Sequence, residues 1–161
     1  MGGKKQNFDL DDTDRTILRL LQEDGTLSNP KLAEHVSLSV TPCWRRLRRL
    51  EEDGFITSYQ ANLDRRKLGL DVLAFVQLSF VVVTDVSIKR FEEVILAHPE
   101  VLSCHKITGQ ADYLLQVVAE DLDAYSEFVE NVLRVVPGIS SIHSSLAMRE
   151  IKSSSRLPIP D

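Results

Sequence analysis

The second half of the chain contains one pattern twice, and this repeat restricts the fold more than any other feature. Residues 99–105 and 137–143 both follow the pattern P-x-[VI]-x-S-x-H. Each copy is typical of a helix that ends at a proline and is followed by a strand. Strands are also expected at 72–83 and 112–119, ahead of the two helices. The order βαββαβ predicts a ferredoxin-like sandwich, with both helices on one face of an antiparallel sheet.

The first expected strand, residues 72–83, is apolar on both faces. One face carries Ala74, Val76, Leu78, Phe80 and Val82, and the opposite face is also largely apolar. A sheet with one face in water alternates cleanly between apolar and polar residues instead. Because the helices cover only one face, the sequence predicts that a second copy of the chain covers the other, as a homodimer.

Residues 39–54 are the most informative stretch of the first half. Apolar residues at spacings of three and four predict a helix whose apolar stripe contains Val40, Cys43, Trp44, Leu47 and Leu50. The other face is basic, with Arg45, Arg46, Arg48 and Arg49. We interpret Trp44 as the largest core residue, although it could instead stack on a base. The arginines alone could be a solvated face.

Two helices expected before this one favour a more specific interpretation. Asp11 or Asp12 can cap the first, and Ser28 can cap a short second helix. A turn then leads into the arginine helix, which is the helix-turn-helix order, and arginine can bind phosphate or guanine with two hydrogen bonds. The sequence therefore predicts contacts with double-stranded DNA from Ser39, Thr41, Pro42, Arg45, Arg46 and Arg49.

Residues 55–61 are rich in β-formers and predict a strand or wing. The linker that follows, 62–71, contains a basic cluster at 65–67, which could touch phosphates or only solvate the linker. We expect an α+β protein with a winged helix-turn-helix domain at 1–61 and a ferredoxin-like domain at 72–161. The polar start of the chain, from Met1 to Asn7, is expected to be frayed.

Charge and composition agree with this division. Residues 1–70 contain 12 Lys/Arg and 11 Asp/Glu, whereas the rest contains 7 and 13, so the net charge of −5 comes from the second half. DNA contact is therefore expected in the first half only. Neither a signal peptide nor an apolar run of membrane-spanning length is found, which predicts a cytoplasmic protein without a membrane partner.

The sequence offers little support for metal or catalytic chemistry. The four histidines and the two cysteines, Cys43 and Cys104, have no ligand-like spacing, and both cysteines lie in apolar patterns that favour packing over a disulfide. No nucleophile-base order or phosphate loop is found. We expect no metal, no cofactor and no enzymatic activity.

Three stretches resemble the Lrp/AsnC (feast/famine) family of transcriptional regulators. They are TPCWRRLRRLEEDGFI in the arginine helix, GQADYLLQV at 109–117 and SSLAMREIK at 144–152. The resemblance implies assembly of dimers into octamers or other multimers. It also implies that the loop at 109–112 helps to bind a small effector, usually an amino acid, where dimers meet.

By position, the resemblance implies an effector site lined by Lys106, Thr108, Gly109, Gln110, Asp112, Leu122, Arg134, Ser144, Ser145 and Ala147. Backbone N–H groups of the turn could receive an α-carboxylate, and Asp112 could accept from an α-ammonium. A structural alternative stays open, in which Gly109 takes a positive φ and Asp112 stabilises the hairpin.

We expect a sequence-specific transcriptional regulator whose assembly and DNA binding respond to an amino acid. The alternative is a small-molecule-binding or enzymatic ferredoxin-like protein with an accessory helical domain. Salt-sensitive binding to the DNA beside its own gene distinguishes the two.

Overall fold

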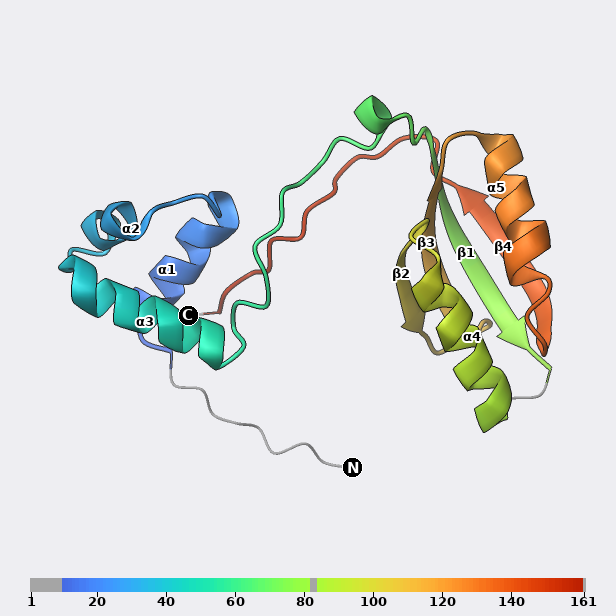
Figure 1. Ribbon diagram of the computed structural model, residues 1–161, viewed down its shortest axis with the longest axis horizontal. Helices are drawn as coiled ribbons and strands as arrows, with labels where there is room; N and C mark the ends of the chain where they lie inside the picture. Colours follow the sequence, from blue (N-terminus) through green and yellow to red (C-terminus); the bar gives the residue numbers. More distant parts are fainter. Residues whose placement is uncertain (1–9, 82–83, 161) are drawn as a thin grey trace. The chain divides into compact units, whose positions relative to one another are not determined.

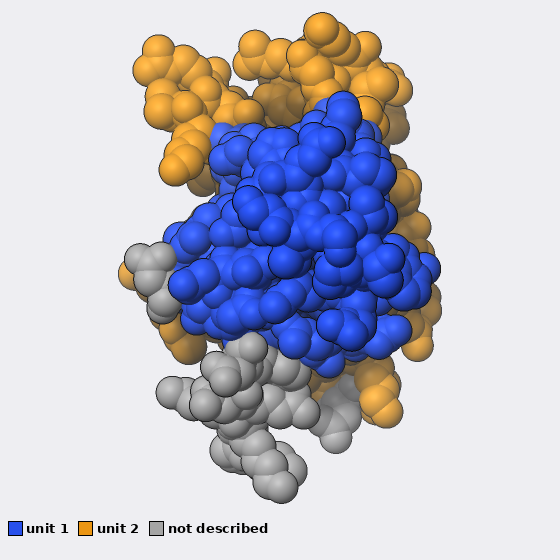
Figure 2. All heavy atoms as spheres, turned by 90° about the vertical axis from the view of Figure 1, so that its left-hand side faces the viewer, with its two compact units in different colours: residues 1–62, 153–161 blue, residues 63–152 orange. Residues whose placement is uncertain are grey.

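The computed structural model describes residues 10–81 and 84–160, and it divides into two compact units (Figures 1 and 2). Unit 1 comprises residues 1–62 and 153–161, and unit 2 comprises residues 63–152. We expected the chain after residue 72 to form one domain, but its last segment belongs to unit 1. The expected frayed start, from Met1 to Asn7, and the end of the first expected strand, Val82 and Val83, lie outside the described residues.

Three helices build unit 1: α1 (Asp12–Glu23), α2 (Asn29–His35) and α3 (Val40–Glu52). Asp11 caps α1 in a capping box with Asp14, and Ser28 and Ser39 are the N-cap residues of α2 and α3. Gly54 ends α3 with φ 77°, as expected for a left-handed stop. The buried apolar side chains of the three helices form one small core, made of Ile17, Leu32, Ala33, Cys43 and Leu50.

The segment after α3, expected to be a strand or wing, contains no strand. Residues 55–61 run as an extended segment without strand pairing, and Tyr59 attaches it to α3 by donating a hydrogen bond to Glu51 over 3.0 Å. A β-rich composition makes a strand only where an edge is available for pairing. Of the two expected forms, the strand is therefore not formed, whereas an extended segment beside α3 agrees with a wing.

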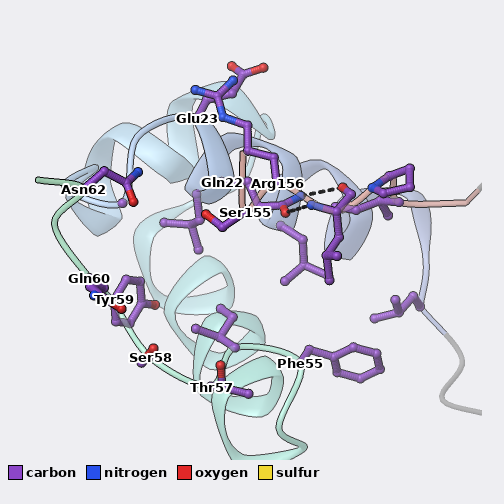
Figure 3. Close-up of a pocket in the computed structure, with 18 of the residues that line it drawn as sticks. Gln22, Glu23, Phe55, Thr57, Ser58, Tyr59, Gln60, Asn62, Ser155 and Arg156 are labelled. Carbon is purple, nitrogen blue, oxygen red and sulfur yellow. Dashed lines mark hydrogen bonds between the residues drawn. The ribbon is translucent and has the colours of Figure 1, made fainter. Parts of the chain in front are cut away.

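The C-terminal segment lies along α1 instead of extending unit 2. Arg15 Nε donates to the carbonyl of Pro160 over 3.0 Å, and Gln22 both donates to the Leu157 carbonyl and accepts from the Leu157 N–H. Between this segment, α1 and residues 55–62 lies a cavity of about 650 Å³ (Figure 3). These contacts explain why residues 153–160 belong to unit 1.

Unit 2 confirms the predicted ferredoxin-like order. Its elements are η1 (Arg66–Leu68), β1 (Val72–Phe80), α4 (Asp85–Ala97), β2 (Val101–Lys106), β3 (Tyr113–Ala119), α5 (Leu122–Phe128) and β4 (Ile139–Leu146). The antiparallel sheet has the strand order β2-β3-β1-β4 (Figure 1). Helix α5 continues into a π-helical segment, η2 (Val129–Leu133), which the regular apolar spacing does not predict.

The two faces of β1 differ in how far their side chains are exposed. Ala74, Val76 and Leu78 are fully buried and pack with side chains of α4 and α5, including Phe91 and Phe128. On the other face Phe75 is 39% exposed and Gln77 is exposed. One sheet face therefore holds the core of unit 2, and the opposite face presents a mixed apolar and polar surface.

Candidate nucleic-acid interface and effector site

The exposed face of α3 carries apolar as well as basic side chains. Trp44 is 51% exposed and Val40 is 47% exposed, so the interpretation of Trp44 as the largest core residue was wrong. Successive residues of a helix are about 100° apart around its axis, so Leu47 and Leu50 lie within about 40° of the buried Cys43. Trp44 lies about 100° from Cys43 and therefore outside the side of the helix that packs into the core. The Arg48 guanidinium lies 5.5 Å from the centre of the Trp44 ring, within cation–π range.

Two of the arginines that were expected to contact DNA form ion pairs with α1 and its cap. Arg46 contacts Asp11 over 2.6 Å and Asp14 over 2.9 Å, and Arg49 forms a short contact with Asp14. The Asp14 side chain is fully buried, whereas the Arg46 and Arg49 side chains remain 30% and 48% exposed. The expectation that Arg46 lies on the outer face was wrong, because its side chain leaves α3 on the side that faces α1.

These contacts also shift two pKa values. Hydrogen bonds from the backbone of Asp14 and from the Arg46 guanidinium lower the pKa of Asp11. Hydrogen bonds to Asp11 and Asp14 raise the pKa of Arg46. Both shifts favour the charged pair, so the orientation of α3 against α1 depends on ionised groups.

Sequence reasoning missed Asp14. An available signal was its spacing, three residues before Ile17 and seven before Leu21, which puts a carboxylate on the apolar stripe of α1. A buried charge requires a partner. In the structure these partners are Arg46 and Arg49 of α3.

The start of α3 remains accessible. Thr41 and Arg45 are exposed, and Pro42 is half-buried. Ser39 makes no capping hydrogen bond with its side chain, and Asn29 Nδ2 donates to the carbonyl of Val40 over 3.0 Å. Among the described residues, no hydrogen bond or ion pair involves the Arg45 guanidinium. Its charge is therefore available to an external ligand.

The turn between β2 and β3 is connected to the end of β1. The carboxylate of Asp112 accepts from the Phe80 N–H over 2.8 Å, and the Asp112 N–H donates to the Leu78 carbonyl over 2.9 Å. Gly109 has φ 123°, as the structural alternative requires. Asp112 thus fixes the hairpin to a neighbouring strand, while Lys106, Thr108, Gly109 and Gln110 remain exposed around it.

The two candidate serines point to opposite sides of the sheet. Ser144 pairs with Val76 on the core face and accepts a hydrogen bond from the Tyr125 hydroxyl, whereas Ser145 pairs with the outward-facing Phe75. Successive residues of a strand alternate between faces. The two serines therefore do not share one cavity within this chain.

The remaining effector candidates are dispersed. Leu122 is 57% exposed at the start of α5, Arg134 pairs with Glu130 over 3.2 Å, and the Ala147 N–H donates to the Leu73 carbonyl. Ser145 is paired with Phe75, and Asp112 is bonded to Phe80. These two positions are five residues apart along β1, which corresponds to about 16 Å. The ten candidates are thus not brought together by a single chain.

Other kinds of site find no support in the described part of the chain. It holds no group of three or more His, Cys, Asp or Glu residues placed to bind a metal ion. Both cysteines are free, and burial raises the pKa of the Cys43 and Cys104 thiols. Within the same described ranges, no helix is long and apolar enough to cross a membrane.

Comparison with known proteins gives a consistent result. Residues 73–157 match the family described as Lrp/AsnC ligand binding domain, and residues 10–57 match the winged helix-turn-helix DNA-binding family. The chain is 44% identical over 150 residues to the DNA-binding transcriptional activator DecR of Escherichia coli K12, covering 93% of this chain and 99% of DecR. It is also 44% identical to the Bkd operon transcriptional regulator of Pseudomonas aeruginosa, covering 94% and 99%.

Among solved structures, the chain resembles a Neisseria meningitidis transcriptional regulator in complex with L-methionine. The TM-score is 0.89 at 41% identity, covering 93% of this chain and 97% of that one. The fold and the matched domains define a DNA-binding transcriptional regulator with a ligand-binding domain, not an enzyme. The chain belongs to the Lrp/AsnC family.

Proposed function

We propose that this regulator binds specific DNA through the exposed face of α3, with Arg45 as its main cationic contact. The supporting observation is that the Arg45 side chain is exposed and has no ion pair among the described residues. Ser39, Thr41 and Pro42 lie beside it at the start of the helix, the part that contacts base edges in helix-turn-helix proteins. Arg49 is half exposed and suits a phosphate contact, whereas Arg46 orients the helix.

A pair of variants tests this assignment. Arg45→Ala is expected to weaken binding to the DNA beside its own gene about 5- to 150-fold if Arg45 reads a base, or to reduce the salt slope by about one if it binds phosphate. Arg46→Ala is the matched control and is expected to lower the stability of unit 1. Unchanged affinity and salt slope of Arg45→Ala would refute the proposed interface.

We also propose a homodimer formed through the outer face of the sheet in unit 2. Phe75 and Ser145 form a register pair on this face, where an apolar ring stands partly exposed among polar groups. Phe75→Glu places a charge in that interface and is expected to shift the sedimentation coefficient towards the monomer. Leu96→Glu, at an 86% exposed position of α4, is the control. An unchanged assembly of Phe75→Glu would exclude this face.

The effector of this protein is, we propose, an amino acid bound at the turn between β2 and β3, where dimers meet and form multimers. The exposed Lys106, Thr108, Gly109 and Gln110 support this location. The L-methionine complex of the Neisseria regulator supports an amino acid as the class of ligand. A ligand that bound at a contact between dimers would couple assembly to DNA binding. Because Asp112 fixes the turn, its contribution is structural.

A thermal-shift screen of the twenty amino acids identifies the ligand, and calorimetry then compares variants. Lys106→Ala and Thr108→Val are expected to weaken its binding, whereas Ser144→Ala, on the core face, is not. If the wild type and all three variants bind the ligand with equal affinity, the effector site does not lie at the turn.

We propose that the protein acts in the cytoplasm, where its DNA is, and cell fractionation tests this.

A further inference from the structure

The exposed apolar side chains of α3 have no function in the contacts described so far. Val40 and Trp44 lie one helical turn apart and are each about half exposed, 47% and 51%. An indole is a large apolar group, and leaving it in water is unfavourable unless it has a partner. Their position in the first half of α3 is the region of a recognition helix that reaches base edges.

The surroundings of Trp44 indicate the kind of partner. The Arg48 guanidinium lies over the ring, 5.5 Å from its centre, and Arg45, the next residue along the helix, is exposed. A basic rim around an apolar centre complements a surface that is negative at its edges and apolar between them. The major groove has phosphates at its edges, and thymine presents a C5-methyl group on its floor.

We propose that Trp44, with Val40, determines specificity by contacting thymine methyl groups in the major groove. This inference rests on the proposed entry of α3 into that groove. Stacking on an extruded base is a poorer fit, because Arg48 already occupies one side of the ring and extrusion requires unstacking of the duplex. Arg45 and Arg48 then bind phosphate or guanine beside the thymines.

Replacing thymine by deoxyuridine tests the contact, because it removes only the methyl group. The probe is the DNA beside its own gene, amplified with either dTTP or dUTP. Wild-type protein is expected to bind the uracil DNA about fourfold more weakly per contacted methyl, the factor that corresponds to one buried methyl group. Trp44→Ala is expected to lose most of this preference, and Trp44→Phe to retain more of it. The double variant Val40→Ala/Trp44→Ala is expected to bind both DNAs with the same affinity.

Arg45→Ala is the matched control. It is expected to bind both DNAs more weakly but to keep the thymine preference, since it leaves Trp44 in place. If Arg45→Ala weakens binding while Trp44→Ala keeps the full preference, the thymine contact is refuted and the proposed interface stands. If wild-type protein does not bind this DNA, both are refuted. A loss of self-association in Trp44→Ala without any change in DNA affinity would assign the surface to a protein contact and also refute the proposal.

Discussion

The two units differ in what fixes their helices. In unit 2, α4 and α5 pack on the sheet through a core that includes thirteen buried residues of the described part, none of them charged. In unit 1 the core has five buried apolar residues, and the buried carboxylate of Asp14 joins α1 to α3 through two arginines. Apolar contacts are neither screened by salt nor titrated, whereas ion pairs are weakened by both screening and protonation. The orientation of the recognition helix is therefore the more easily perturbed feature.

The largest expected effect is in the apolar core. Leu115→Ala removes a fully buried side chain from β3 and is expected to lower the free energy of unfolding of unit 2 by about 2–5 kcal/mol. Hydrogen exchange resolved along the chain measures each unit separately. Protection of α1 and α3 is expected to stay unchanged, and an equal loss there would show that the units do not unfold independently.

Removing the buried carboxylate tests the other half of the comparison. Asp14→Ala leaves Arg46 and Arg49 without their shared partner, and because both are partly exposed they can regain water. We expect a loss of about 2 kcal/mol in unit 1. Asp12→Ala, which removes a fully exposed acid from the same turn, is the control and is expected to change little. Equal effects of the two variants would contradict a special role for Asp14.

Removing a helix cap is expected to lower the stability of unit 2 by less than the core variant does. Thr84 caps α4 by accepting from the Ser87 N–H over 3.1 Å. Thr84→Ala is expected to destabilise unit 2 by about 1 kcal/mol, measured as a lower denaturation midpoint. Thr84→Ser keeps the hydroxyl and is expected to restore most of the loss. If serine and alanine behave alike, the hydroxyl does not stabilise the helix.

The smallest expected effect is a pH dependence specific to unit 1. The pKa of Asp11 lies below its ordinary value of 3.8 in the folded protein, so its carboxylate stabilises the fold at higher pH. This stabilisation is lost as the pH falls through the lowered pKa. Because Asp11 is 51% exposed, the contribution is less than about 1 kcal/mol. Asp11→Asn is expected to flatten the acid limb of the stability profile of unit 1, and an unchanged limb would assign the dependence elsewhere.

Local signals predicted the elements of the fold. Asp11 and Ser28 marked the starts of the first two helices, because these residue types are favoured at helix N-termini. Asp11 does cap α1 with its side chain, whereas the Ser28 side chain makes no capping hydrogen bond. The repeated pattern predicted the element order βαββαβ, because each copy indicates a helix, a proline stop and a strand in succession. These predictions depended only on residues close together in the sequence.

The errors arose where distant residues meet. Periodicity placed Trp44 on the apolar stripe, but the direction of that stripe depends on where α1 packs, and Arg46 was misplaced for the same reason. The expectation that Ser144 and Ser145 line one site within the chain had a different fault. Successive residues of a strand point to opposite faces, so strand alternation alone separates the two side chains. The position of residues 153–160 had no local signal, because their partners on α1 are about 140 residues earlier.

The late position of that segment has a consequence for synthesis. Residues 153–160 contact α1, but the ribosome adds them only after all of unit 2. About 90 residues separate the two parts of unit 1, which corresponds to roughly 5–20 s of translation. During this interval the side of α1 that later accepts Leu157 and Pro160 is open to water and to chaperones. The part of the protein made first is thus among the last to be completed.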